Sequence, residues 1–252
     1  MRGLAAATAC TVVAALAVGC SSVVGGTAKP APNLKPRPLS GRTVEHVLLD
    51  GKVLSRMLGQ PLVARQPAKF GGADRLDERD VPAESADCLG VAAMLQKSVY
   101  DSADIQNVAS VSWWNDGDPA QVISVMEGVV SLPSAEQAQA LFAKFPDQWQ
   151  RCKGQTITEE TGPISTTTEI GEVQSLDSVV AVTNTATATL PNMPALQPTP
   201  QARAIGVRMN CIVEVEIVFF GDRQPTDPGS ADPDGSAVEV ARAMMEKVSH
   251  LS

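Results

Sequence analysis

The sequence is poor in the residues that zinc sites and nucleophilic enzymes use. Its 252 residues contain two histidines, His46 and His250, and five cysteines with no Cys-x-x-Cys spacing. A histidine–cysteine zinc site needs closely spaced ligands that this chain does not supply. A Ser–His or Cys–His pair would depend on one of two histidines near opposite ends of the chain. We therefore predict no metal site and no catalytic residues.

Positive charge is also scarce. The chain has 20 Lys and Arg against 28 Asp and Glu, a net charge of -8. Nucleic-acid binding requires a basic face, so this class of partner is excluded. No Gly-rich phosphate loop follows a predicted strand, and we expect no cofactor. An acidic run with Asp227, Asp232 and Asp234 lacks the closing glutamate of an EF-hand calcium loop.

The chain has one long apolar run, at residues 4–18. It is shorter than the roughly 20 residues that a membrane-spanning helix needs. Arg2 precedes it and small residues end it, which is typical of a secretory signal. The tetrapeptide Ala-Val-Gly-Cys that ends at Cys20 resembles a bacterial lipobox, although Ala17 stands where most lipoboxes carry leucine. We predict a signal peptide at residues 1–19 and lipidation of Cys20; the alternatives are an ordinary signal with an incidental cysteine and a soluble core helix.

Residues 20–42 are predicted to form a lipid-anchored tether. Two adjacent glycines and four prolines prevent regular structure, and such linkers are extended and semi-rigid. Lys29, Lys35 and Arg37 either rest on anionic headgroups or are simply solvated. The expected location is the extracytoplasmic face of the cell membrane, with the membrane contacted through lipid on Cys20.

Residues 43–252 are enough for one domain with a hydrophobic core. Apolar spacing predicts helices near residues 43–58, 87–100, 134–145 and 240–251. Within these, Asp50 with Gly51 interrupts the first helix, Ser134 with Gln137 forms a capping box, and Pro146 ends or kinks the third.

Alternation of apolar and polar residues predicts the strands. Residues 108–114 and 121–132 flank the turn sequence Asn-Asp-Gly-Asp-Pro and predict a hairpin. Residues 179–190 predict a strand with a row of threonines on one side. Residues 202–220 predict one long strand, and Glu159, Glu160, Glu214 and Glu216 are assigned to a solvated face. The fold class is therefore α+β, a single domain with an antiparallel sheet packed by helices.

The cysteines predict one disulfide in an exported chain. Loss of the signal and lipidation of Cys20 leave three thiols, which allow three pairings. Cys211 lies in the apolar register of residues 202–220, so we expect it to be a free, buried thiol. Cys88 begins a predicted helix and Cys152 follows another, where the backbone can adjust. We predict that they pair, contributing roughly 4 kcal/mol through a loop of about 65 residues.

Three segments resemble the PknH-like extracellular domain family, and together they span about residues 43–251: DCLGVAAMLQKSVY, VVSLPSAEQAQALFAKFPDQWQRCKGQTIT and RAIGVRMNCIVEVEIVFFG. The most specific parts are the Cys-Leu-Gly that starts at Cys88 and the Trp-x-x-Cys that ends at Cys152. This family forms the sensor region of a mycobacterial serine/threonine kinase and also occurs in stand-alone mycobacterial lipoproteins. The resemblance implies the same Cys88–Cys152 bridge and a cleft for an extracellular ligand. Gln201 and Phe220 stand where family members often carry a second bridge.

We therefore expect a non-enzymatic lipoprotein that binds a small or lipidic envelope ligand in a cleft between sheet and helices. Trp113 and Trp114 place one indole inward and one outward, and Thr183 and Thr185 are further candidates to line the cleft. Partial cover by a helix and a solvent-facing sheet surface are the competing interpretations of these residues. The alternative functions are a protein-interaction module that docks to an envelope enzyme or transporter, and a cell-wall hydrolase.

Overall fold

The computed structural model describes residues 36–79, 81–118, 120–221 and 231–252. The compact unit that contains them is Pro36–Ser252, so residues 36–42, assigned to the tether from sequence, belong to it. The predicted signal peptide (residues 1–19) and Cys20 lie outside the described residues.

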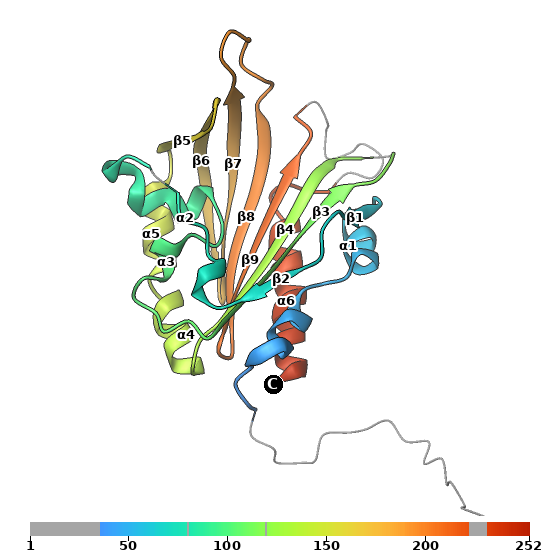
Figure 1. Cartoon of the computed structure of the whole chain (residues 1–252), viewed down its shortest axis with the longest axis vertical. Helices are drawn as coiled ribbons and strands as arrows, with labels where there is room; N and C mark the ends of the chain where they lie inside the picture. The colour runs from blue at the N-terminus through green and yellow to red at the C-terminus, as the bar shows by residue number, and fades with distance from the viewer. Residues whose placement is uncertain (1–35, 80, 119, 222–230) are drawn as a thin grey trace, which may run out of the picture. The chain divides into compact units, whose positions relative to one another are not determined.

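An antiparallel sheet forms the centre of the domain (Figure 1). Within the described residues it has nine strands in the order β1-β3-β4-β9-β8-β7-β6-β5, and β2 pairs with β3 as well. The strands are β1 Leu62–Ala64, β2 Lys69–Gly71, β3 Asn107–Asn115, β4 Val122–Ser131, β5 Thr156–Thr161, β6 Ile164–Leu176, β7 Val179–Thr189, β8 Thr199–Arg208 and β9 Cys211–Phe219. The predicted α+β class, with helices packed on an antiparallel sheet, is confirmed.

Helices cover both faces of this sheet. One side of the sheet, named here the α6 face, packs against α6 (Ser236–Leu251), α1 (Gly51–Leu58) and the 3-10 helix η1 (Gly41–Val47). The opposite side, named here the α5 face, carries η3 (Ala83–Cys88), α2 (Leu89–Ala92), α3 (Lys97–Tyr100), α4 (Ala135–Phe142) and α5 (Phe145–Cys152), grouped toward one end of the sheet (Figure 1). A short 3-10 helix, η2, spans Ala73–Arg75 beside β2. Among the helices of these described residues, none is long and apolar enough to cross a membrane.

Several local predictions are confirmed. Asp50 accepts hydrogen bonds from the backbone of Lys52 and Val53 and so begins α1 after η1 has ended. β3 and β4 form the predicted hairpin. Ser134 accepts a hydrogen bond from the backbone of Gln137 at the start of α4. α4 ends before Pro146, which lies in the first turn of α5, where a missing N–H costs nothing.

The single strand predicted at residues 202–220 is wrong. Met209 and Asn210 turn the chain, and β8 and β9 pair from Arg208 opposite Cys211 onward. Met209 adopts a positive φ of 51°, and the buried side chain of Asn210 bonds both backbone groups of Leu39 and the carbonyl of Leu132. A two-residue turn exchanges the faces to which odd and even residues point. Because both faces are buried here, the apolar alternation continued through the turn without a break.

The predicted helix at residues 87–100 is also interrupted. α2 and α3 are each four residues long, and the backbone between them is not helical. Leu95 adopts a positive φ of 56°, which a bulky residue avoids unless its surroundings hold it there. Tertiary hydrogen bonds described below override the helical spacing of the apolar residues.

The predicted disulfide joins Cys88, at the end of η3, to Cys152, at the end of α5. It therefore ties two elements of the helical layer on the α5 face, 64 residues apart in sequence. Cys211 is a free, buried thiol on the α6 face, where burial raises its pKa to about 12.

A buried carboxylate connects the α6 face to the start of the domain. Glu127 on β4 is inaccessible to solvent, and it accepts hydrogen bonds from the backbone of Leu49 (3.0 Å) and from the indole of Trp113 (2.9 Å). Burial raises the pKa of Glu127 from 4.5 to about 7, although both hydrogen bonds and the charge of Lys247 lower it. The ammonium of Lys247 donates to the carbonyl of Leu48, and burial lowers its pKa.

Glu127 predicts how stability depends on pH. Its folded pKa exceeds its unfolded pKa, so the stability gained by protonation is fully present below the unfolded value and is lost as pH rises through about 7. Relative to Glu127→Gln, the wild type should lose about 2 kcal/mol of unfolding free energy between about pH 5 and pH 8. Urea denaturation of both proteins at matched pH measures this difference. Parallel stability curves for the two proteins would contradict the assignment.

Candidate functional site

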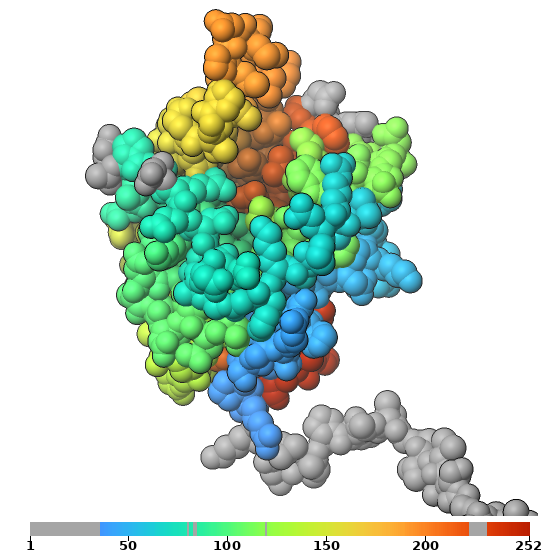
Figure 2. All heavy atoms as spheres, viewed as in Figure 1, coloured from blue at the N-terminus to red at the C-terminus, as the bar shows by residue number. Residues whose placement is uncertain are grey.

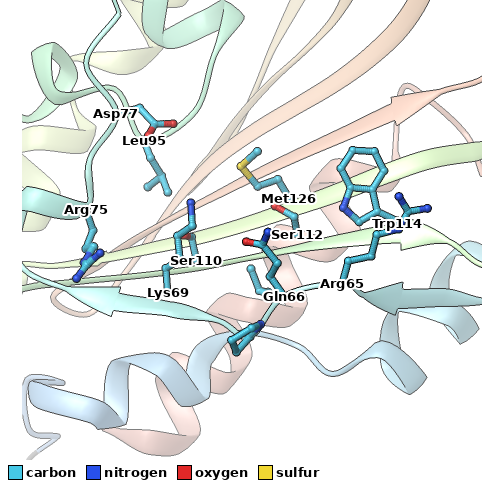
Figure 3. A pocket seen from close by; sticks show the side chains of 12 residues that line it. Arg65, Gln66, Lys69, Arg75, Asp77, Leu95, Ser110, Ser112, Trp114 and Met126 are labelled. Carbon is cyan, nitrogen blue, oxygen red and sulfur yellow. The ribbon is translucent and has the colours of Figure 1, made fainter.

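A pocket of about 330 Å³ opens on the α5 face of the sheet, beyond the end that the helices cover (Figure 3). Its floor is formed by β3 and β4, and residues 65–77 lie across it from the edge of the sheet. Figure 2 shows this segment lying in front of β3 and β4, beside a recess in this face of the molecule. We call residues 65–75 the outer wall, and Leu95 with Asp77 the inner wall.

The floor of the pocket follows from strand register. Side chains two residues apart on β3 share a face, so Ser110, Ser112 and Trp114 all lie on the α5 face. Met126 on β4 pairs with Ser112 and extends the floor toward β9. Gly128 is the next residue of β4 on this face, and an added Cβ there would lie 2.9 Å from Leu95 side-chain atoms. The floor is therefore part polar and part apolar, and it is closed where Leu95 lies on Gly128.

The outer wall carries cationic side chains. Lys69 on β2 pairs with Ser110, so the two side chains project from adjacent strands on the same face. The guanidinium of Arg65 lies 5.1 Å from the centre of the Trp114 ring, within cation–π range. Arg75 lies at the opposite end of the pocket from Trp114, and its Nε is 3.3 Å from Asp74 Oδ2 (Figure 3).

The inner wall is held in place by backbone hydrogen bonds. The amide of Asp77 donates to the carbonyl of Leu95 and the amide of Lys97 donates to the carbonyl of Asp77, both at 2.8 Å. Asp77 also forms an isolated parallel bridge with Gln96. These bonds attach Asp77, at the end of the segment 65–77, to the stretch between α2 and α3. Asp77 and Leu95, the two parts of the inner wall, are therefore held together as one unit.

Glu214 on β9 fixes this unit to the sheet. One carboxylate oxygen accepts hydrogen bonds from the Leu95 amide (3.1 Å) and the Tyr100 hydroxyl (2.6 Å). The other accepts from Arg203 (2.9 Å), whose guanidinium also donates to the carbonyl of Gly90. Arg203 and Glu214 are buried, with side chains 0% and 3% exposed. Burial, and then the charge of Glu214, raise the pKa of Tyr100 well above its ordinary value. We call the buried pair Arg203 and Glu214, together with Tyr100, the clamp.

The prediction that the strand glutamates lie on a solvated face is wrong for Glu214 and Glu159. Glu159 on β5 is nearly buried and pairs with Arg79 at 2.8 Å. Glu216 is partly buried, with Oε2 3.9 Å from Arg203 Nε, and burial raises its pKa although Arg203 opposes this. Helices and loops cover the α5 face, so alternation of apolar and charged residues does not mark a solvent surface here.

The structure brings one of the four candidate cleft residues to the pocket. Trp114 is 37% exposed and lines it, whereas Trp113 points to the α6 face and donates to Glu127. Thr183 also belongs to the α6 side, where its hydroxyl donates to Asp234 at 2.9 Å, and Thr185 is exposed two residues further along β7. These two threonines lie on the opposite face of the sheet from this pocket, because on β7 it is the even residues that face the α5 side.

Neither histidine lies at this pocket. His46 is exposed on η1, and His250 near the end of α6 is 3.5 Å from Glu246. Within the described residues no cluster of three or more His, Cys, Asp and Glu could hold a metal ion. Asp227 of the acidic run lies outside those residues. The pocket therefore offers groups suited to binding: cations, hydroxyls and apolar surface.

Sequence reasoning did not select Arg65, Lys69 and Arg75. They lie in a loop-like, highly charged segment, whose charges are equally well explained by solvation. Gln66, Pro67, Ser110 and Met126 were not selected either. The available signal was local: three of the cations of an acidic protein occur within eleven residues.

The disulfide, the α+β fold and the open pocket are together typical of a binding domain that works outside the cytoplasm. The chain belongs to the PknH-like extracellular domain family, whose model matches residues 39–247. This confirms the resemblance found in the sequence. The family is the extracellular, sensor-type part of a kinase, a non-catalytic module, and membership fits an extracytoplasmic location.

Curated relatives and a solved structure agree with this assignment. The chain is 25% identical over 130 residues to the serine/threonine-protein kinase PknH of Mycobacterium bovis and to that of Mycobacterium tuberculosis, in each case over 52% of this chain. It spans about a fifth of the length of these relatives (21% and 20%). The crystal structure of the extracellular domain of PknH from Mycobacterium tuberculosis superposes with a TM-score of 0.67. That match covers 85% of this chain and 98% of the other at 19% identity, and shows the same fold.

The clamp makes a prediction about stability. Arg203→Met should lower the free energy of unfolding by about 3–5 kcal/mol, because it leaves the buried carboxylate of Glu214 without a counter-charge. Arg203→Met with Glu214→Leu should cost less than the single substitution, since no isolated charge remains. Hydrogen exchange should show the Leu95 amide losing protection in the single variant at conditions where the protein stays folded.

Arg208→Met is the matched control. Arg208 lies on the same strand but is exposed, and its side chain bonds only Ser249 within the described residues. If Arg203→Met proves no more destabilising than Arg208→Met, the clamp does not hold the inner wall.

Proposed function

We propose that the protein is a lipoprotein anchored to the extracytoplasmic face of the cell membrane, whose sensor-type domain binds a small or lipidic envelope molecule. The role is one of binding, without turnover. Membership in a family of extracellular sensor domains supports the location and the type of domain. The signal-like run before Cys20 supports the anchor.

The observation that carries the binding role is the exposed Trp114 beside the half-buried Met126 in an open pocket. Helices and loops cover most of this face of the sheet, and exposed large apolar side chains on such a face mark a binding site. A bound ligand would bury them. The cavity of about 330 Å³ lies at the lower end of the range for small-molecule sites. The rigid sheet below it and the clamped inner wall beside it preserve its shape without a ligand.

The anchor is tested by replacing its cysteine. The full chain, expressed in its host with an alkyne-tagged palmitate, should be labelled and should fractionate with membranes. Cys20→Ser should abolish the label, because no thiol remains at the lipobox. Cys10→Ser, within the predicted signal peptide, is the control and should be labelled like the wild type. Label that persists in Cys20→Ser would refute the anchor.

The binding role is tested by native mass spectrometry of the full chain purified from its host in mild detergent. We expect a retained non-covalent mass, with occupancy reduced in Trp114→Ala because the ligand loses an aromatic contact. Val63→Ala is the control: Val63 is equally exposed and pairs with Trp114 across the strands, but does not line the pocket. Absence of any bound mass, or equal occupancy in Trp114→Ala, would count against a ligand in this pocket.

A protein-interaction module is the second candidate, and the loop between β7 and β8 favours it. This loop projects beyond the rest of the sheet (Figure 1), and exposes Met193 (55%) and Leu196 (48%). Crosslinking in intact cells that captures an envelope protein at this loop, from protein that carries no small molecule, would favour this second function over the first.

A further inference from the structure

We propose that the ligand of this pocket is an anionic amphiphile: a phosphate or carboxylate group joined to an apolar chain. This inference rests on the proposed binding role and adds the chemical class of the ligand. The anionic group would lie above the serines of β3, next to Lys69 or next to Arg65, and the apolar chain along Met126 and Leu95.

The charges of the pocket carry the first step. Arg65, Lys69 and Arg75 line it against one carboxylate, that of Asp77, in a protein whose net charge is -8. Arg75 is paired with Asp74. Arg65 and Lys69 form no ion pair within the described residues, and Asp77 lies away from Arg65, at the other end of the pocket (Figure 3). Arg65 and Lys69 are thus left without an ion-pair partner, Arg65 at the Trp114 end of the cavity and Lys69 toward the end where Asp77 lies (Figure 3).

The polar part of the floor provides matching hydrogen-bond donors. Ser110 lies opposite Lys69 in the strand register, and Ser112 follows on the same face. In the part of the chain that the structure describes, neither hydroxyl bonds another protein group. The guanidinium of Arg65 lies within cation–π range of the Trp114 ring and forms no hydrogen bond within the described residues, so its N–H groups are free for an oxyanion. Serine hydroxyls, an ammonium and a guanidinium are together the donor set of a phosphate or carboxylate site.

The remaining lining is apolar and argues against a bare inorganic anion. Leu95, Met126 and Pro67 line the cavity together with the Trp114 ring. A free phosphate would leave this surface in contact with water, whereas an attached hydrocarbon chain would bury it, with a gain of about 25 cal/mol per Å². Leu95 is held in its left-handed conformation by the clamp, so this apolar surface is fixed before the ligand arrives.

Calorimetric titration of the full-length protein with four probes tests the class. The probes are octyl phosphate, octanol, octyltrimethylammonium and inorganic phosphate, and octyl phosphate should bind most tightly. At least one of Lys69→Gln and Arg65→Gln should weaken octyl phosphate binding about tenfold, the effect of losing one hydrogen bond to a charged group. Lys69→Arg should keep most of the affinity. Met126→Ala should weaken octyl phosphate but leave inorganic phosphate unchanged.

Arg151→Gln is the matched control. It removes the same charge from an exposed position on α5 that does not line the pocket, and octyl phosphate should bind this variant like the wild type. Equal binding of octanol, or unchanged affinity in both Lys69→Gln and Arg65→Gln, would overturn the anionic class while leaving ligand binding intact. Inorganic phosphate binding as tightly as octyl phosphate would overturn the need for an apolar chain. If no probe binds and the host-purified protein carries no bound mass, the binding role itself fails.

Discussion

The ion pair between Arg203 and Glu214 is the contact on which the arrangement of the α5 face depends. Each residue also bonds backbone groups of the chain above it, Gly90 and Leu95, so two charges on adjacent strands fix a loop that has little regular structure of its own. A buried pair of this kind contributes little net stability compared with apolar residues, but removing one partner is costly. Its effect is therefore specificity: it selects one position for the inner wall of the pocket. The Cys88–Cys152 bridge restrains the same layer from its outer side.

The pocket exists because the two faces of the sheet are covered to different extents. On the α6 face, α6, α1 and η1 pack over a continuous apolar surface. On the α5 face the helices gather toward one end, and β3 and β4 continue past them with serines, a tryptophan and a methionine. Residues 65–77 approach this uncovered part from the edge of the sheet and bring cations with them. A rigid floor with a charged rim is a suitable place to recognise a ligand that is anionic at one end and apolar at the other.

The sequence predicted those features that depend on local chemistry. The Asp50 and Ser134 caps, the β3–β4 hairpin and the α+β class follow from residues close together in the chain. The errors share a different cause, burial by distant segments. The turn at Met209 went unnoticed because the strands on both sides of it are buried on both faces, and the break at Leu95 is imposed by Glu214, 119 residues away. Trp114 was found through alternation, whereas Lys69 was not, because the side chains that face it come from another strand.

The central claim is that the pocket between the outer wall and the clamped inner wall holds an anionic amphiphile. The most direct test is a crystal structure of the protein purified from its own host without added ligand. The account predicts density for a bound molecule whose charged end lies within hydrogen-bond distance of Lys69 or Arg65 and whose apolar part contacts Met126 and Leu95. A pocket that contains only water, or a molecule bound instead at the loop of Met193 and Leu196, would contradict it.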